Sequence, residues 1–101
     1  MKVIIHSIHF TAADRLKTYV QNKCEKLDRF FDRIVEATVR LKLQNEVKGA
    51  NKLVEITLSV PGDTLVATEK GKTFEEATDL ATDKLKAQLK KYKGKMRVRA
   101  S

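Results

Sequence analysis

Hydrophobic residues recur with two different periods along the chain, and these periods divide it into six elements. The opening KVIIH (residues 2–6) is mostly apolar and β-branched, which is typical of a short strand. The segments EATVRLKLQ (36–44) and LVEITLSV (53–60) alternate apolar and polar residues, which predicts strands with one buried and one solvated face. After the turn signal Pro-Gly, DTLVATEKG (63–71) predicts a further strand. The residues expected to face the core are Ala37, Val39, Leu41, Leu43, Val54, Ile56, Leu58 and Val60.

A first helix is predicted over residues 12–31, where apolar residues recur at helical spacing. Thr11 followed by Asp14 resembles an N-terminal capping pair. The helix is expected to bury a stripe made of Leu16, Tyr19, Val20, Cys24, Leu27, Phe30 and Phe31.

A second helix has the clearest start signal in the chain, because Thr73 followed by Glu76 forms a capping box. It is expected to run through Lys93, with Gly94 placed to end it. Its apolar face is Phe74, Ala77, Ala81, Leu85, Leu89 and Tyr92.

The order of these elements, β-α-β-β-β-α, predicts the fold class. The apolar stripes are buried together if both helices pack on one face of a mainly antiparallel four-stranded sheet, an α+β sandwich. The order is also similar to that of double-stranded RNA-binding domains. We expect one domain over residues 1–94, followed by a flexible basic tail over residues 95–101.

Composition excludes several classes of function. No apolar run approaches the roughly 20 residues of a membrane span, and the start lacks the layout of a signal peptide, so we expect a cytosolic protein. Cys24 lies in an apolar stripe, and with His6 and His9 it makes no metal-binding spacing. The acids at the start of the last helix complement its dipole. We therefore expect no enzyme activity, cofactor or metal.

Charge is concentrated at one end of the chain. Residues 83–101 hold eight Lys and Arg and one acid, whereas residues 1–82 hold thirteen bases and twelve acids. Such asymmetry favours a polyanionic partner, with nucleic acid first and an anionic membrane surface second. A membrane-bound form needs an amphipathic helix that is free to insert, and the last helix is expected to use its apolar face in the core.

The candidate phosphate-binding residues lie on both predicted helices. At about 100° per residue, Lys84 and Lys91 fall on one flank of the last helix beside its apolar face, whereas Lys86, Lys90 and Lys93 fall on its outer side. If the helices pack side by side, we expect the Lys84 and Lys91 flank to merge with the first helix into one basic groove. The other members of this set are Lys23, Lys26 and Arg29 on the first helix, and Arg97 and Arg99 on the tail.

The strands and the last helix argue against two common modes of RNA binding. The solvated strand faces lack the Phe and Tyr residues on which single-stranded bases stack. Double-stranded RNA-binding domains commonly begin their last helix with a lysine cluster, whereas this chain has the acidic TFEEATD there. A generic duplex-binding module nevertheless remains the alternative.

Several segments together resemble the ribosome hibernation-promoting factor family, which includes the short hibernation factor and protein Y. They are KLDRFFDRI, VRLKL, VPGDTLVATEKG and DKLKAQLKKYKGK, in the order β-α-β-β-β-α, and the similarity runs from about Val3 to Lys95. The resemblance implies a stress or stationary-phase factor that binds the small ribosomal subunit in the mRNA and tRNA channel, blocks initiation and protects idle ribosomes.

The resemblance also implies which residues contact ribosomal RNA. By motif position they are Lys23, Lys26 and Arg29 on the first helix and Lys84 and Lys91 on the last, with Lys86 and Lys90 nearby. Ala87 departs from the family, in which an Arg commonly precedes Gln-Leu.

The end of the sequence separates the subtypes of this family. Because the chain stops at Ser101 with a short basic end, it looks most like the short type, without the domain that pairs ribosomes in long members. The expected partners are the small subunit and the intact ribosome, with a separate ribosome modulation factor as a further one. We expect a monomer.

Overall fold

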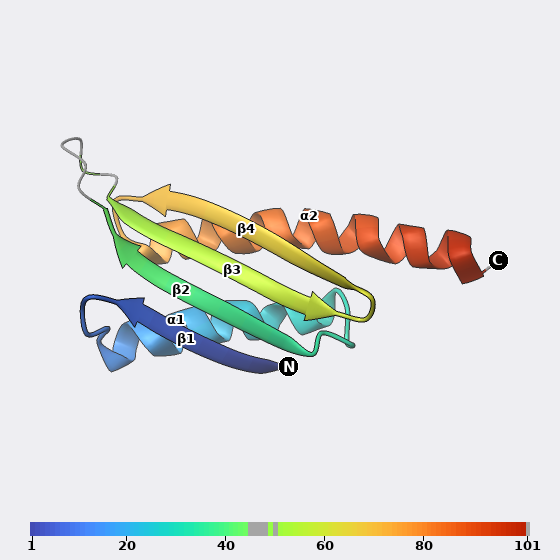
Figure 1. Ribbon diagram of the computed structural model, residues 1–101, viewed down its shortest axis with the longest axis horizontal. Helices are drawn as coiled ribbons and strands as arrows, with labels where there is room; N and C mark the ends of the chain where they lie inside the picture. Colours follow the sequence, from blue (N-terminus) through green and yellow to red (C-terminus); the bar gives the residue numbers. More distant parts are fainter. Residues whose placement is uncertain (45–48, 50, 101) are drawn as a thin grey trace.

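The four predicted strands form one sheet, which is mainly antiparallel. The computed structural model describes the backbone of residues 1–44, 49 and 51–100, and the side chains of these residues up to Met96. Strands β1 (Lys2–Ile8), β2 (Glu36–Leu43), β3 (Lys52–Val60) and β4 (Asp63–Gly71) form one sheet in the order β1-β2-β3-β4 (Figure 1). β1 and β2 run parallel, and the other two pairs are antiparallel.

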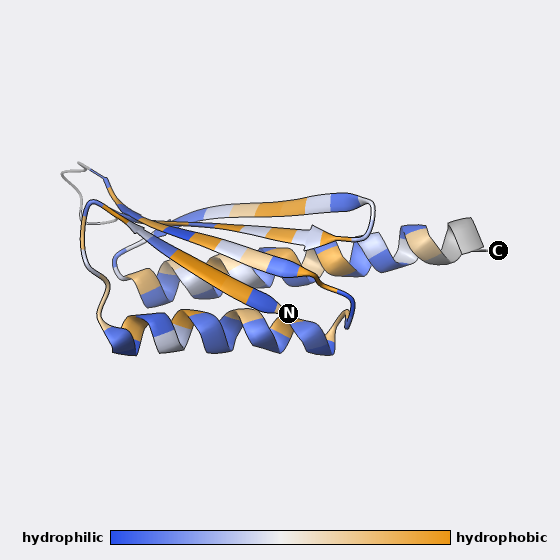
Figure 2. Cartoon of the chain, turned by 60° about the horizontal axis from the view of Figure 1, so that its bottom comes forward, coloured by the Kyte–Doolittle hydropathy of each residue, from blue (hydrophilic) through white to orange (hydrophobic). Residues whose placement is uncertain are grey.

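Two helices form a second layer on one face of this sheet (Figures 1 and 2). They are α1 (Asp14–Glu25), which continues into a short 3-10 helix η1 (Lys26–Arg29), and α2 (Phe74–Ala100). The helix predicted over 12–31 is therefore shorter and tightens in its last turn, a common ending for an α-helix. The α+β class and the one-sided helix layer are confirmed.

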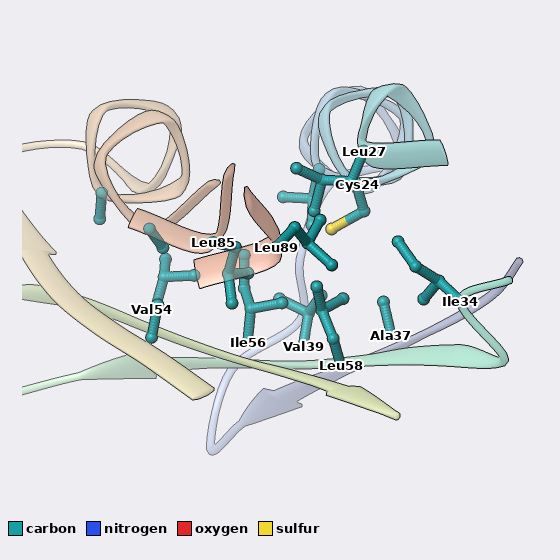
Figure 3. Packing of buried hydrophobic residues seen from close by; sticks show 14 of the residues in the cluster. Cys24, Leu27, Ile34, Ala37, Val39, Val54, Ile56, Leu58, Leu85 and Leu89 are labelled. Atoms are coloured by element: carbon teal, nitrogen blue, oxygen red, sulfur yellow. The ribbon is translucent and has the colours of Figure 1, made fainter. Parts of the chain in front are cut away.

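The core lies between the sheet and the helices (Figure 3). Alternate residues of β2 and β3 point into it, and the whole predicted apolar face of α2 is buried. Leu43 is the exception: it is 45% exposed because it is the last residue of β2, at the rim of the sheet. The expectation that it faces the core is wrong.

The two predicted helix starts have different outcomes. At α2, the Glu76 amide donates to the Thr73 hydroxyl over 3.0 Å, as the capping box predicts, and the Glu76 carboxylate accepts from the Lys72 amide over 3.3 Å. At α1, Ala13 occupies the cap position and no side chain bonds to it, so the predicted Thr11 and Asp14 pair is wrong.

The predicted end of the second helix at Gly94 is also wrong, since α2 continues to Ala100. A glycine inside a helix costs only about 1 kcal/mol relative to alanine. Beyond it, Met96 packs against the core and contacts Arg33, which favours two further helical turns. Residue 94 is thus no boundary of secondary structure. The side chains of Arg97 and Arg99 lie outside the described part.

Candidate nucleic-acid interface

The two helices meet along a seam whose first contact is centred on Asp79 of α2. Its Oδ1 accepts a hydrogen bond from the Tyr19 hydroxyl of α1 over 2.7 Å and lies 3.2 Å from the Lys23 ammonium. The hydrogen bond to Asp79, then burial, then the charges of Asp79 and Glu75 raise the pKa of Tyr19 to about 12. Lys23, one of the predicted phosphate-binding residues, is therefore partly buried in a polar contact between the helices.

The second contact along the seam joins Lys86 of α2 to Phe30, which follows η1. The Lys86 ammonium lies 5.3 Å from the centre of the Phe30 ring, within the range of a cation–π contact, and 3.7 Å from the Asp83 carboxylate. The expectation that Lys86 points to the outer side of the helix is therefore wrong: it faces the seam. Lys90, one turn later, is exposed on the same flank.

The opposite flank of α2 faces strand β4 and not α1. Lys84 forms an ion pair with Glu69 of β4, and Gln88 donates to the Val66 carbonyl over 2.9 Å. Lys91 lies about two turns after Lys84 and is exposed on that flank. The expected merging of the Lys84 and Lys91 flank with the first helix is therefore wrong. Helical spacing assigns the lysines to two flanks of α2, but it does not indicate which of these flanks packs beside α1.

The remaining predicted cations of the first helix lie on η1 and are exposed. Lys26 and Arg29 line a shallow hollow of about 350 Å³ together with Asn22 and Glu25. These four residues belong to α1 and η1, and α1 turns its hydrophilic side away from the sheet (Figure 2).

The electrostatic character of α2 reverses along its length. Its first half carries Glu75, Glu76, Asp79 and Asp83, and its bases begin at Lys84. Because η1 lies beside the basic half, as the contact between Phe30 and Lys86 shows, cations of both helices gather at that end of the layer. A polyanion is attracted there and repelled from the acidic half.

The open face of the sheet offers less to a nucleic acid. Thr38, Arg40 and Lys42 of β2 point to it, and two shallow hollows meet at Ile8 and Arg40. None of the four strands contains Phe, Tyr or Trp, so among the strand residues this face offers a base only the imidazole ring of His6, which lines one of the two hollows.

Cys24 has a structural role, and the described residues form neither a metal site nor a membrane-spanning helix. Burial, with a smaller effect from the charge of Glu25, raises the pKa of the Cys24 thiol to about 12, and the residue fills the core as predicted. In the described part of the chain, no group of His, Cys, Asp or Glu could hold a metal ion. No helix there is long and apolar enough to cross a membrane.

Fold and surface together define an α+β domain of one mixed sheet with a cationic helix layer. A family model described as Sigma 54 modulation protein / S30EA ribosomal protein matches residues 3–97, and the chain belongs to this family. The resemblance inferred from the sequence is thereby confirmed.

The relatives agree with this assignment. The ribosome hibernation promotion factor of Staphylococcus aureus (strain COL) is 32% identical over 89 residues, which are 88% of this chain and 46% of the relative. The chain therefore spans about half the length of that protein.

Two solved structures share the fold. A ribosomal subunit interface protein from Coxiella burnetii superposes with a TM-score of 0.83 at 21% identity, covering 93% of this chain and 99% of that one. The N-terminal domain of Thermus thermophilus Protein Y superposes with a TM-score of 0.77 at 28% identity, covering 91% and 99%.

Proposed function

We propose that this protein is a ribosome hibernation factor that binds the small ribosomal subunit in the mRNA and tRNA channel through its helix layer. Bound there, it blocks initiation and preserves inactive ribosomes during stress or stationary phase. The observation that carries the proposal is the gathering of η1 and α2 cations at one end of the seam, on a member of a ribosome-associated family.

The proposed contacts with ribosomal RNA fall into two rows. The main row follows the seam side of the layer: Lys23, Lys26, Arg29, Lys86 and Lys90. A second row, Lys84 and Lys91, lies on the β4 side. Arg97 and Arg99, which belong to the last turns of α2, are further proposed contacts.

The proposed mechanism is steric occlusion without chemistry, so it requires neither an enzyme activity nor a cofactor. About five to eight cations each neutralise a phosphate. Binding weakens steeply with salt, because the logarithm of the binding constant falls by roughly 0.7–0.9 per neutralised phosphate for each unit of log salt concentration. The protein acts in the cytoplasm as a monomer, on the small subunit and on the intact ribosome. A separate modulation factor would then be required for ribosome dimers.

The competing function is that of a generic double-stranded RNA-binding module. Against it stands the acidic first half of α2, where Glu75 and Glu76 occupy the exposed first turn. Such a start repels the phosphates that a duplex would place there.

Sedimentation of purified protein with small subunits and, in parallel, a binding titration with a short RNA duplex test the proposal. We expect tight co-sedimentation with small subunits and much weaker binding to the duplex at the same salt concentration. Equal affinity for the two would favour the generic module. A gradient profile of stationary-phase cells then shows whether the protein travels with the small subunit and the ribosome in vivo.

A further inference from the structure

Arg33, which lies between η1 and β2, is an exposed cation held in a defined place. Its guanidinium carbon lies 5.7 Å from the centre of the Phe31 ring, and its Nη2 lies 3.8 Å from the Met96 sulfur of α2. Two neighbours from different elements thus restrict a side chain that would otherwise sample many rotamers.

The ring that supports Arg33 is itself anchored. Phe31 is 8% exposed and packs edge-on against Tyr92 of α2, with ring centres 5.2 Å apart. The Tyr92 hydroxyl donates to the Pro61 carbonyl in the turn between β3 and β4. The position of Arg33 is therefore set by the packed core and not by the loop that carries it.

Arg33 also differs from three lysines of the helix layer in having no carboxylate partner. Lys23 pairs with Asp79, Lys84 with Glu69 and Lys86 with Asp83. Among the described side chains no acid lies within ion-pair distance of Arg33. One N–H on Nη2 is directed at the Met96 sulfur, a weak acceptor, and the remaining N–H groups of the guanidinium can bind the oxygens of a phosphate in a bidentate manner.

The place of Arg33 continues the cationic side of the seam. From Lys86 through Lys90 and Lys93 to Met96, α2 advances about 15 Å at 1.5 Å per residue. Arg33 contacts the far end of this stretch and Phe30 its near end, so the loop after η1 runs alongside it.

We propose that Arg33 is a phosphate-binding residue at the far end of the seam, oriented by Phe31 and Met96. This inference rests on the proposed function and adds a contact that no sequence pattern singled out. It gives the bound strand a fixed end point, because a guanidinium held on the core defines both the position and the orientation of the phosphate it binds.

The test compares Arg33→Gln with Arg40→Gln, which removes the same charge from an exposed arginine on the open face of the sheet. Both variants and the wild type are titrated against small ribosomal subunits, and against a short RNA duplex at low salt, over a series of salt concentrations. We expect Arg33→Gln to weaken binding roughly ten-fold and to lower the salt slope by about 0.7–0.9, the value for one phosphate, with no comparable change for Arg40→Gln.

Arg33→Lys separates geometry from charge. It should restore the salt slope, because one cation is again present, but only part of the affinity, because an ammonium cannot form the bidentate contact. If Arg33→Gln behaves like Arg40→Gln on both probes, the proposal is overturned. If the wild type binds the duplex but not small subunits, the proposed function fails while the role of Arg33 is still decided on the duplex.

Discussion

The ammonium of Lys23 lies 3.2 Å from Oδ1 of Asp79, so that a predicted RNA-binding cation is held by a carboxylate of the neighbouring helix. The same oxygen accepts the Tyr19 hydroxyl bond, which joins α1 to α2 at the acidic half of the seam. A phosphate that binds Lys23 must therefore compete with Asp79. In the proposed complex, this carboxylate would limit how far RNA extends along the seam.

Replacing Asp79 should strengthen RNA binding. In Asp79→Asn the Lys23 ammonium is freed and a negative charge beside the phosphate path is lost, so we expect several-fold tighter binding to small subunits. The cost in stability should be small, about 0–1 kcal/mol, because the ion pair is partly exposed. Binding titrations and urea unfolding measure the two effects. Glu75→Gln, an exposed neighbour with the same charge change, is the control, and weaker binding by Asp79→Asn would contradict the competition.

Because the pKa of Tyr19 is raised, the contact between the two helices makes the stability of the fold depend on pH above 10. Because the folded pKa of about 12 exceeds the ordinary value of 10.0, the folded state favours the protonated phenol. This contribution to stability is complete below pH 10 and is lost as the pH rises from 10 towards 12.

Ultraviolet titration of the phenolate in a Tyr92→Phe background isolates Tyr19, since these are the two tyrosines of the chain. We expect a midpoint near 12 that falls back towards 10 when Asp79→Ala is added, because alanine removes the acceptor whose bond is the largest cause of the shift. A midpoint unchanged by Asp79→Ala would show that the bond does not form in solution.

Two glycines are expected to respond in opposite ways to alanine. A Cβ at Gly71, where β4 meets the start of α2, would lie 3.0 Å from the Ala77 nitrogen and 3.1 Å from the Thr73 oxygen, both backbone atoms. At Gly94 a Cβ meets nothing within 4 Å. Gly71→Ala should lower the free energy of unfolding by about 1–3 kcal/mol, the usual cost of overpacking. Gly94→Ala should raise it by up to about 1 kcal/mol, because alanine favours the helix.

Thermal or urea unfolding of both variants checks this pair. A destabilising Gly94→Ala would mean that α2 ends at this glycine, as the sequence pattern predicted, and that the continuation to Ala100 is wrong.

Alternation in β2 and β3 and the spacing of Phe74 to Tyr92 were sufficient to predict the sheet, the helix layer and most of the core. These signals are local, and burial of Val54, Ile56 and Leu58 or of Leu85 and Leu89 follows from them directly. The arrangement of the site was not predictable in the same way. Helical spacing defines the two flanks of α2, but packing decides that Lys86 meets Phe30 while Lys84 meets Glu69.

Arg33 and Asp79 escaped prediction for a related reason. Arg33 lies outside any periodic element, and its partners Phe31 and Met96 are distant from each other in the sequence. Asp79 is one of several acids in the first half of α2, and their interaction with the helix dipole already explains why an acid stands there. Its contact with α1 was therefore not predicted. Both depend on tertiary packing, which a single sequence does not specify.

The central claim, that the helix layer and not the open sheet face binds the ribosome, is tested most directly by two charge-reversal variants. Lys26→Glu with Lys90→Glu alters exposed residues of the helix layer, and Arg40→Glu with Lys42→Glu makes the same charge change on the sheet face. Each purified variant is sedimented with small ribosomal subunits at moderate salt, after circular dichroism has verified the fold. The account predicts that the helix-layer variant no longer pellets with the subunits while the sheet-face variant still does. Loss of binding in the sheet-face variant alone, or equal loss in both, would contradict it.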